Sequence, residues 1–173
     1  MGVRVKTFDI NPALEPDVVA SLHDIGDFVE PNEFDLISCC EVLEHLPFEH
    51  FESAISTFAR FSDRLFLTLP VHGQSFGFGG VLHFPKFHRW LGAWLRMPIG
   101  QGRLPNMHFW EIDYDRKTRK KEILKVLGRY YESVETGLFK ANPYHCYFKC
   151  SIAKGFPPSV SMMGEIIPPE NQA

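Results

Sequence analysis

Short apolar runs separated by polar and turn-forming residues mark the first 70 positions of the chain. The runs have the length of β-strands and occupy residues 3–8, 18–21, 34–40 and 64–69. The third run is almost continuously apolar, which is typical of a parallel strand covered on both faces. Because segments of crossover length separate the runs, we expect right-handed βαβ units around a parallel sheet.

Two later segments repeat apolar residues at helical spacing. Phe51, Ile55 and Phe58 fall at positions i, i+4 and i+7, which predicts a helix over about residues 47–62. A second amphipathic stretch predicts a helix that ends at Gly128.

The last third of the chain predicts a pair of antiparallel strands. They cover about residues 131–139 and 144–152 and are joined around Asn142. A Pro-rich stretch follows, and such chain ends are often poorly ordered. We therefore expect one domain over residues 1–154 and a C-terminal tail over residues 155–173.

Composition narrows the class of protein. The chain has 173 residues, of which 45% are hydrophobic and 23% charged, so it suits one folded domain and not a disordered, collagen-like or coiled-coil protein. A formal net charge of −3 gives no broad electrostatic attraction to nucleic acid, and no nucleic-acid partner is expected. The chain lacks an apolar run near the ~18 residues of a membrane span.

The four cysteines indicate a reducing compartment. Cys39 and Cys40 are adjacent, Cys146 and Cys150 follow much later, and no C-x-x-C zinc spacing occurs. Adjacent cysteines rarely bond each other, so we expect reduced and mostly buried thiols in a cytoplasmic protein.

Several stretches resemble one enzyme family. Residues 5–25 (VKTFDINPALEPDVVASLHDI), 34–51 (FDLISCCEVLEHLPFEHF) and 64–70 (RLFLTLP) are similar to the central part of class I S-adenosylmethionine-dependent methyltransferases of the type 11 kind. Residues 108–114 (HFWEIDY) and 141–150 (ANPYHCYFKC) resemble the C-terminal half of a bacterial and archaeal branch of that family.

The resemblance implies an α/β fold with a departure at its start. The family has a Rossmann-like, doubly wound sheet in the order 3-2-1-4-5-7-6, with strand 7 antiparallel. This chain begins at the family's second strand, and its glycine cluster, Gly77 to Gly80, comes after the fifth. We therefore expect the sheet without strand 1, its helix and its Gly-rich loop. Either the chain is a piece of a longer protein, or strands 2 and 4 have closed up around a damaged site.

The resemblance also implies cofactor-binding residues. Asp9 ends the first strand, where a carboxylate can accept hydrogen bonds from both ribose hydroxyls of S-adenosylmethionine, and Ile10 follows it. Asp24 and Ile25 match the loop that contacts the adenine amino group and ring. The alternatives are an Asx turn between Asp9 and Asn11, and a solvated loop acid at position 24.

Glu41, Glu44 and His45 form an E-x-x-E-H motif after the third apolar run. On a helical turn these positions share one face. Some relatives, the small-RNA 2′-O-methyltransferases and the ubiquinone-pathway O-methyltransferases, bind a metal through such a motif and a later histidine, here His108. Three interpretations remain open: a divalent-metal site, a pocket residue or proton acceptor, and a helix cap. We assign Glu41, His45 and His108 to catalysis, with Glu41 also at the cofactor, and rank metal binding below this role.

Residues 71–105 lie where the family builds its acceptor lid. They are rich in glycine, aromatic and basic residues, and we expect a helix over about residues 85–96. Trp90 and Trp94, one helical turn apart, could pack on the core, close over the acceptor or rest on a membrane surface as part of an amphipathic helix.

Together these features predict an S-adenosylmethionine-dependent methyltransferase with a small-molecule, glycan-linked or lipid-linked acceptor. An unpaired strand edge would invite a homodimer. One alternative is a non-catalytic remnant that acts as a partner subunit. Another is a nicotinamide-binding Rossmann domain, which explains Asp9 but not the E-V-L-E-H-L sequence or the C-terminal hairpin.

Overall fold

A four-stranded mixed sheet forms the centre of the computed structural model, which describes residues 2–84, 86–97, 104–105, 107–139 and 142–152. Its strands, in spatial order, are β3 (Ile37–Cys40), β4 (Arg64–Pro70), β8 (His145–Ser151) and β7 (Ser133–Leu138). β3 runs parallel to β4, whereas β8 is antiparallel to both β4 and β7. The chain is thus a mixed α/β protein, and the expected C-terminal antiparallel pair is confirmed.

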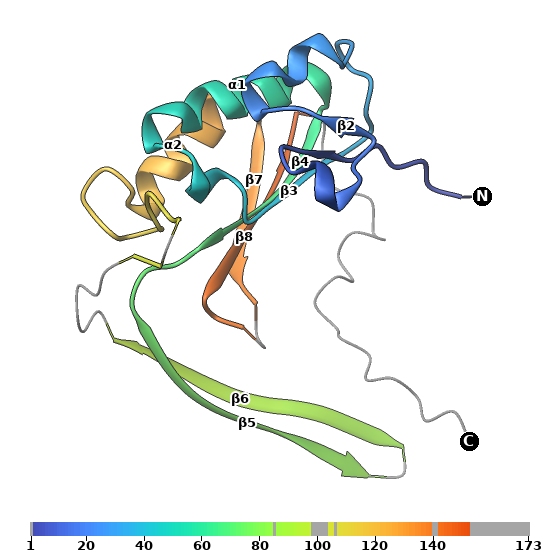
Figure 1. Ribbon diagram of the computed structural model, residues 1–173. Helices are drawn as coiled ribbons and strands as arrows, with labels where there is room; N and C mark the ends of the chain where they lie inside the picture. Colours follow the sequence, from blue (N-terminus) through green and yellow to red (C-terminus); the bar gives the residue numbers. More distant parts are fainter. Residues whose placement is uncertain (1, 85, 98–103, 106, 140–141, 153–173) are drawn as a thin grey trace.

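Two helices cover one side of this sheet (Figure 1). Helix α1 (Phe51–Phe61) follows a short 3₁₀ helix, η4 (Phe48–His50), and the amide of Ser62 closes its last turn. Helix α2 (Lys120–Tyr130) packs against α1.

Gly128 does not end α2, contrary to the prediction from sequence. The helix continues through Arg129 and Tyr130, which both hydrogen-bond Glu52 of α1. The helix stops at Tyr131, which has extended backbone angles and a buried ring.

The main core lies between the sheet and the two helices. β4 supplies it on both faces, because every residue from Leu65 to Pro70 is buried, as its continuous apolar sequence predicts. The largest side chains in this core that are almost fully buried are Trp110, Phe58, Phe148, Leu43, Ile55, Leu65, Leu67, Leu69, Ile112, Ile123 and Leu127.

The N-terminal strands form a separate sheet. β1 (Phe8–Asp9) pairs in parallel with β2 (Val18–Val19), and neither strand pairs with the main sheet. The short connection between them contains the 3₁₀ helix η1 (Pro12–Leu14), and η2 (Leu22–Asp27) follows β2. The alternative from sequence, in which the strands here labelled β1 and β3 close up against each other in one sheet, is therefore wrong for the described chain.

Apolar contacts attach this small sheet to the body. Ile25, Val29 and Phe61 form a second buried cluster, against which Phe8 and Ile37 pack from the two sheets. Side-chain burial, and not a shared hydrogen-bond ladder, thus connects β1 to β3.

A long two-stranded ribbon projects from the body where a helix was expected over residues 85–96 (Figure 1). It consists of β5 (Gln74–Phe84) and β6 (Phe87–Met97), paired in antiparallel fashion along their whole length. The helix prediction is wrong because the preceding segment supplies cross-strand partners for the backbone of β6. The side chains of Trp90 and Trp94 lie outside the described part of the structure.

All four cysteines are free, and only Cys40 is exposed, in agreement with the expected reduced thiols. No helix in the described part of the chain is long and apolar enough to cross a membrane.

Candidate functional site

The E-x-x-E-H motif lies at the carboxyl end of β3. Glu41 follows the last residue of the strand with a φ angle of 55°, in the left-handed region that non-glycine residues rarely adopt. This turn leads into the 3₁₀ helix η3 (Leu43–His45), which holds Glu44 and His45. The motif therefore sits on a tight turn directly after the strand.

Glu44 is completely buried, yet both carboxylate oxygens lack a hydrogen-bond partner among the described residues. Burial raises the pKa of this carboxyl to about 8, and the charges of Glu41 and Glu111 also raise it. A buried polar group without a partner is costly, so its retention in a site needs an explanation.

The imidazole of His108 lies near the Glu44 carboxylate and packs against the ring of His45. The two imidazole rings lie edge to face with centroids 5.0 Å apart. One ligand atom each from Glu44, His45 and His108 falls within 4.8 Å of the others. The sequence prediction named all three residues as metal candidates, and the fold brings them together.

The orientation of both rings is fixed through Nδ1. In His45 this atom lies 3.1 Å from the carbonyl oxygen of Met107, and in His108 it lies 3.1 Å from Glu111 Oε1. A nitrogen that donates to an oxygen carries the proton, so Nε2 of each neutral ring keeps its lone pair. Metal-binding histidines typically donate the other ring N–H to a carbonyl or carboxylate oxygen in this way.

Glu111 hydrogen-bonds three side chains around the Glu44, His45 and His108 group. It was not among the residues predicted from the sequence. It is 2% exposed, and its Oε1 also accepts a 2.6 Å hydrogen bond from the hydroxyl of Tyr144. Its Oε2 lies 3.0 Å from His72 Nδ1. Burial and the bond to Glu111 raise the pKa of Tyr144. The spacing H-x-x-E from His108 was the only sequence signal for Glu111.

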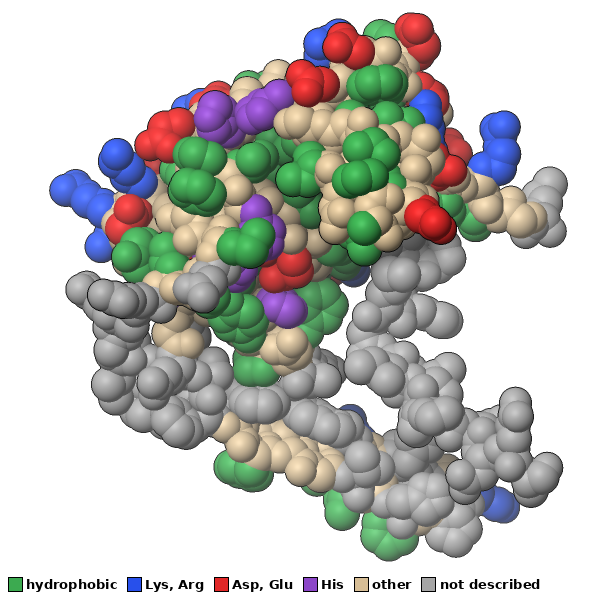
Figure 2. All heavy atoms as spheres, viewed as in Figure 1, with side chains coloured by type: hydrophobic (Ala, Val, Ile, Leu, Met, Phe, Trp, Pro, Cys, Tyr) green, Lys and Arg blue, Asp and Glu red, His purple; other side chains and the backbone are tan. Residues whose placement is uncertain are grey.

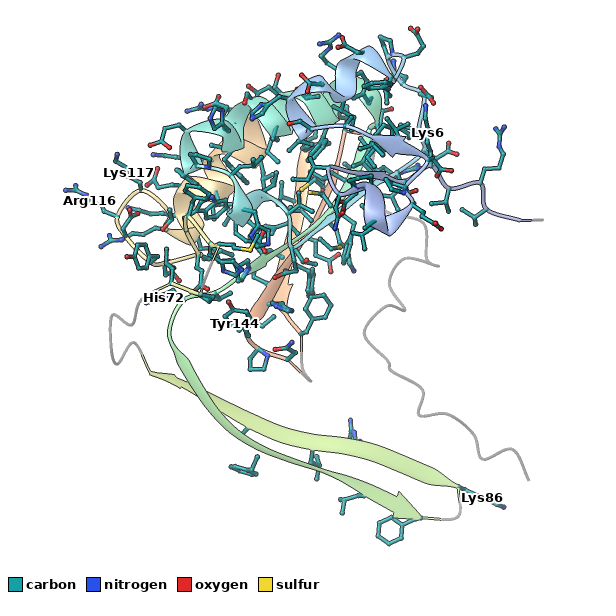
Figure 3. All side chains as sticks on the ribbon, viewed as in Figure 1. Lys6, His72, Lys86, Arg116, Lys117 and Tyr144 are labelled. Atoms are coloured by element: carbon teal, nitrogen blue, oxygen red, sulfur yellow. The ribbon has the colours of Figure 1, made fainter. Side chains whose placement is uncertain are left out.

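His72 and Tyr144 lie on the side of the body from which the ribbon departs (Figure 3). Histidine and acidic side chains reach the surface together on the face shown in Figure 2. Of the residues in the network, His45 is exposed and His72 and His108 are partly exposed, so the network borders solvent through its histidines.

Glu41 has partners of its own. Its Oε1 accepts a 2.9 Å hydrogen bond from the hydroxyl of Thr68 on β4, and its Oε2 lies 3.2 Å from His145 Nε2 on β8. Glu41 is not part of the group of Glu44, His45 and His108, but its charge raises the pKa of Glu44. Thr68 and His145 orient this carboxylate from two neighbouring strands.

The expected cofactor residues lie around β1 and η2. Asp9 Oδ1 accepts a 2.7 Å hydrogen bond from the amide of Asn11, which is the Asx turn considered from the sequence. Ile10 is 73% exposed, and Asp24 is also exposed. Ile25 is buried in the second apolar cluster.

Comparison of the chain with protein-family models, curated proteins and solved structures finds no match.

A divalent metal fits the Glu44, His45 and His108 group. One carboxylate and two imidazoles make a donor set used for Zn²⁺ and for Fe²⁺ or Mn²⁺. The carboxylate without a hydrogen-bond partner and the two oriented rings are what such an ion would need. Without an ion, the same imidazoles could accept a proton from a bound acceptor.

Proposed function

We propose that the chain carries the activity of an S-adenosylmethionine-dependent methyltransferase. The observation that supports this proposal is the order of the strands, which is β2, β1 in the small sheet and β3, β4, β8, β7 in the main one. The resembling family has the order 3-2-1-4-5-7-6. Removal of strand 1 leaves this same succession, split at the place where the two sheets separate, and β8 is antiparallel as strand 7 is.

Asp9 suits the ribose of the cofactor. It ends β1, and the amide of Asn11 holds one of its carboxylate oxygens. The other oxygen, Oδ2, has no hydrogen-bond partner within the described residues, so it is available to a diol. Asp24 would reach the adenine amino group from η2, where Ile25 anchors the loop in the apolar cluster.

The acid and histidine group would serve the acceptor. S-adenosylmethionine supplies an activated methyl group on a sulfonium, so the protein has to orient the acceptor, exclude water and take up a proton. His45 and His108 each keep an Nε2 lone pair for that proton. Glu41, held by Thr68 and His145, would place a negative charge between the two sites.

One part of the family site has no counterpart in the described part of the chain. The family's Gly-rich loop and first strand contact the methionine end of the cofactor, and β1 and β3 are not paired with each other here. In this proposal the affinity for S-adenosylmethionine comes mainly from contacts to its ribose and adenine.

The test is calorimetric titration of S-adenosylhomocysteine into the wild type, Asp9→Asn and Asp35→Asn. Asn can keep the Asx turn but removes the charge, so we expect Asp9→Asn to weaken binding about tenfold, as loss of a charged hydrogen bond does. Asp35 is exposed and provides a matched control whose affinity should equal that of the wild type. If the folded wild type binds no S-adenosylhomocysteine, the proposal fails.

A second candidate function, divalent-cation binding, is favoured by the Glu44, His45 and His108 group. A bound cation would act as a Lewis acid toward an acceptor oxygen. We expect Zn²⁺ or Mn²⁺ to bind with a 1:1 stoichiometry, Glu44→Gln to weaken it at least tenfold, and the exposed control Glu132→Gln to have no effect. Equal affinities for Glu44→Gln and the wild type would exclude this site.

A further inference from the structure

The β5–β6 ribbon exposes apolar side chains on one face. Phe78 is 78% exposed, and Leu82, Phe84 and Leu91 are each about half exposed (47%, 58% and 53%). Residues 78, 82 and 84 alternate to the same side of β5, and Leu91 is paired with Gly80 on that side. Side chains of this size rarely stay in water as a contiguous set without a partner.

The charged residues of the ribbon and of the segments that flank it are all basic. No acidic residue occurs between Asp63 and Glu111, although the chain has 21 of them. Lys86 lies in the turn at the tip of the ribbon (Figure 3), and Arg89 is paired with Leu82 next to it. The ribbon is therefore basic, whereas the chain as a whole has a net charge of −3.

We propose that the ribbon docks on the surface of an anionic phospholipid bilayer. Aromatic and aliphatic side chains next to lysine and arginine are the combination that binds the headgroup region, where each basic residue gains about 1 kcal/mol from anionic lipid. The rest of the chain is acidic and would be repelled, so charge selects the ribbon as the contact. The proposal does not depend on the methyltransferase assignment.

The ribbon would lie in the interface and not cross the bilayer. A two-stranded ribbon has two open edges, whose backbone groups cannot be left unpaired in hydrocarbon. At the headgroup level water and phosphates satisfy these groups, while Phe78, Leu82, Phe84 and Leu91 reach the acyl boundary.

Cosedimentation of the full chain with lipid vesicles tests the proposal. Vesicles contain phosphatidylcholine alone or about 30% phosphatidylserine, an anionic lipid. We expect the wild type to prefer the anionic vesicles at least tenfold and to lose this preference at high salt.

Two double variants separate the contributions. Lys86→Glu with Arg89→Glu should lower partitioning into anionic vesicles at least tenfold, and Phe78→Ser with Leu91→Ser, which removes two exposed apolar side chains, should also lower it at least tenfold. Lys121→Glu with Lys125→Glu makes the same change of charge on the exposed face of α2 and should leave partitioning within twofold of the wild type.

Three results would overturn the proposal. The first is equal binding of the wild type to neutral and anionic vesicles, and the second is an equal loss in the α2 control. The third is a dimer without lipid that the Phe78 and Leu91 substitutions dissociate, because the apolar face would then be an interface between two copies.

Discussion

Replacement of Glu44 by Gln should remove a pH dependence of stability that the wild type shows in the presence of a chelator. The folded carboxyl has a pKa of about 8, against an ordinary value of 4.5, because it is buried beside other acids. The folded state therefore holds a proton that the unfolded state releases. The stabilisation is complete below the unfolded pKa and is lost as the pH rises through the folded pKa.

The expected loss of stability follows from the difference between the folded and unfolded pKa values of Glu44. Between these two pKa values each pH unit lowers the free energy of unfolding by about 1.4 kcal/mol, so the loss from pH 5 to pH 8 has an upper bound of about 4 kcal/mol. Side-chain movement and entry of water around the charged form reduce this penalty. We expect a difference of about 2 kcal/mol between the wild type and Glu44→Gln over this range.

Urea unfolding at pH 5 and pH 8 measures the difference. Glutamine has the shape of the protonated acid, so Glu44→Gln should equal the wild type at pH 5 and exceed it in stability at pH 8. The exposed control Glu132→Gln should follow the wild type at both values. Parallel pH profiles for the wild type and Glu44→Gln would refute the assignment of a buried, protonated carboxyl.

Three further predictions concern packing and the network. Glu111→Gln should cost about 2–3 kcal/mol, since it removes a buried charged acceptor, and Tyr144→Phe about 1 kcal/mol; a double-mutant cycle in urea should show that the two are coupled. Ile55→Ala, at a completely buried position, should lower stability by about 2–5 kcal/mol, whereas Leu138→Ala at a 44% exposed position should cost under about 1 kcal/mol. Arg129→Ala should change stability by less than about 0.5 kcal/mol, because its ion pair is exposed. Thermal melts check both, and a large loss for Arg129→Ala would contradict the reasoning.

The sequence predicts the strands and helices of the body because the positions buried in the core are apolar and recur at strand or helix spacing. The apolar run 64–69 lies within β4, and the stripe of Phe51, Ile55 and Phe58 lies on the buried face of α1. The ribbon was mispredicted because a spacing of four residues, as between Trp90 and Trp94, fits one turn of a helix and also one face of a strand.

The candidate site was predictable only in part. Glu44 and His45 were recognised from the E-x-x-E-H motif and His108 from the family resemblance, and the fold places the three in one group. Glu111 and Tyr144 were not recognised, because Glu111 bonds His72 and Tyr144 across segments that are far apart in the chain. The absence of a pairing between β1 and β3 likewise depends on tertiary structure.

Photolabelling with S-adenosylmethionine that carries a radioactive methyl group tests the proposed cofactor site, on which the activity depends. We expect a label that S-adenosylhomocysteine prevents and that maps to peptides containing Asp9, Asp24 or the Glu41–His45 turn. Label that S-adenosylhomocysteine does not displace, or that maps to α2 or β7, would contradict the proposed site.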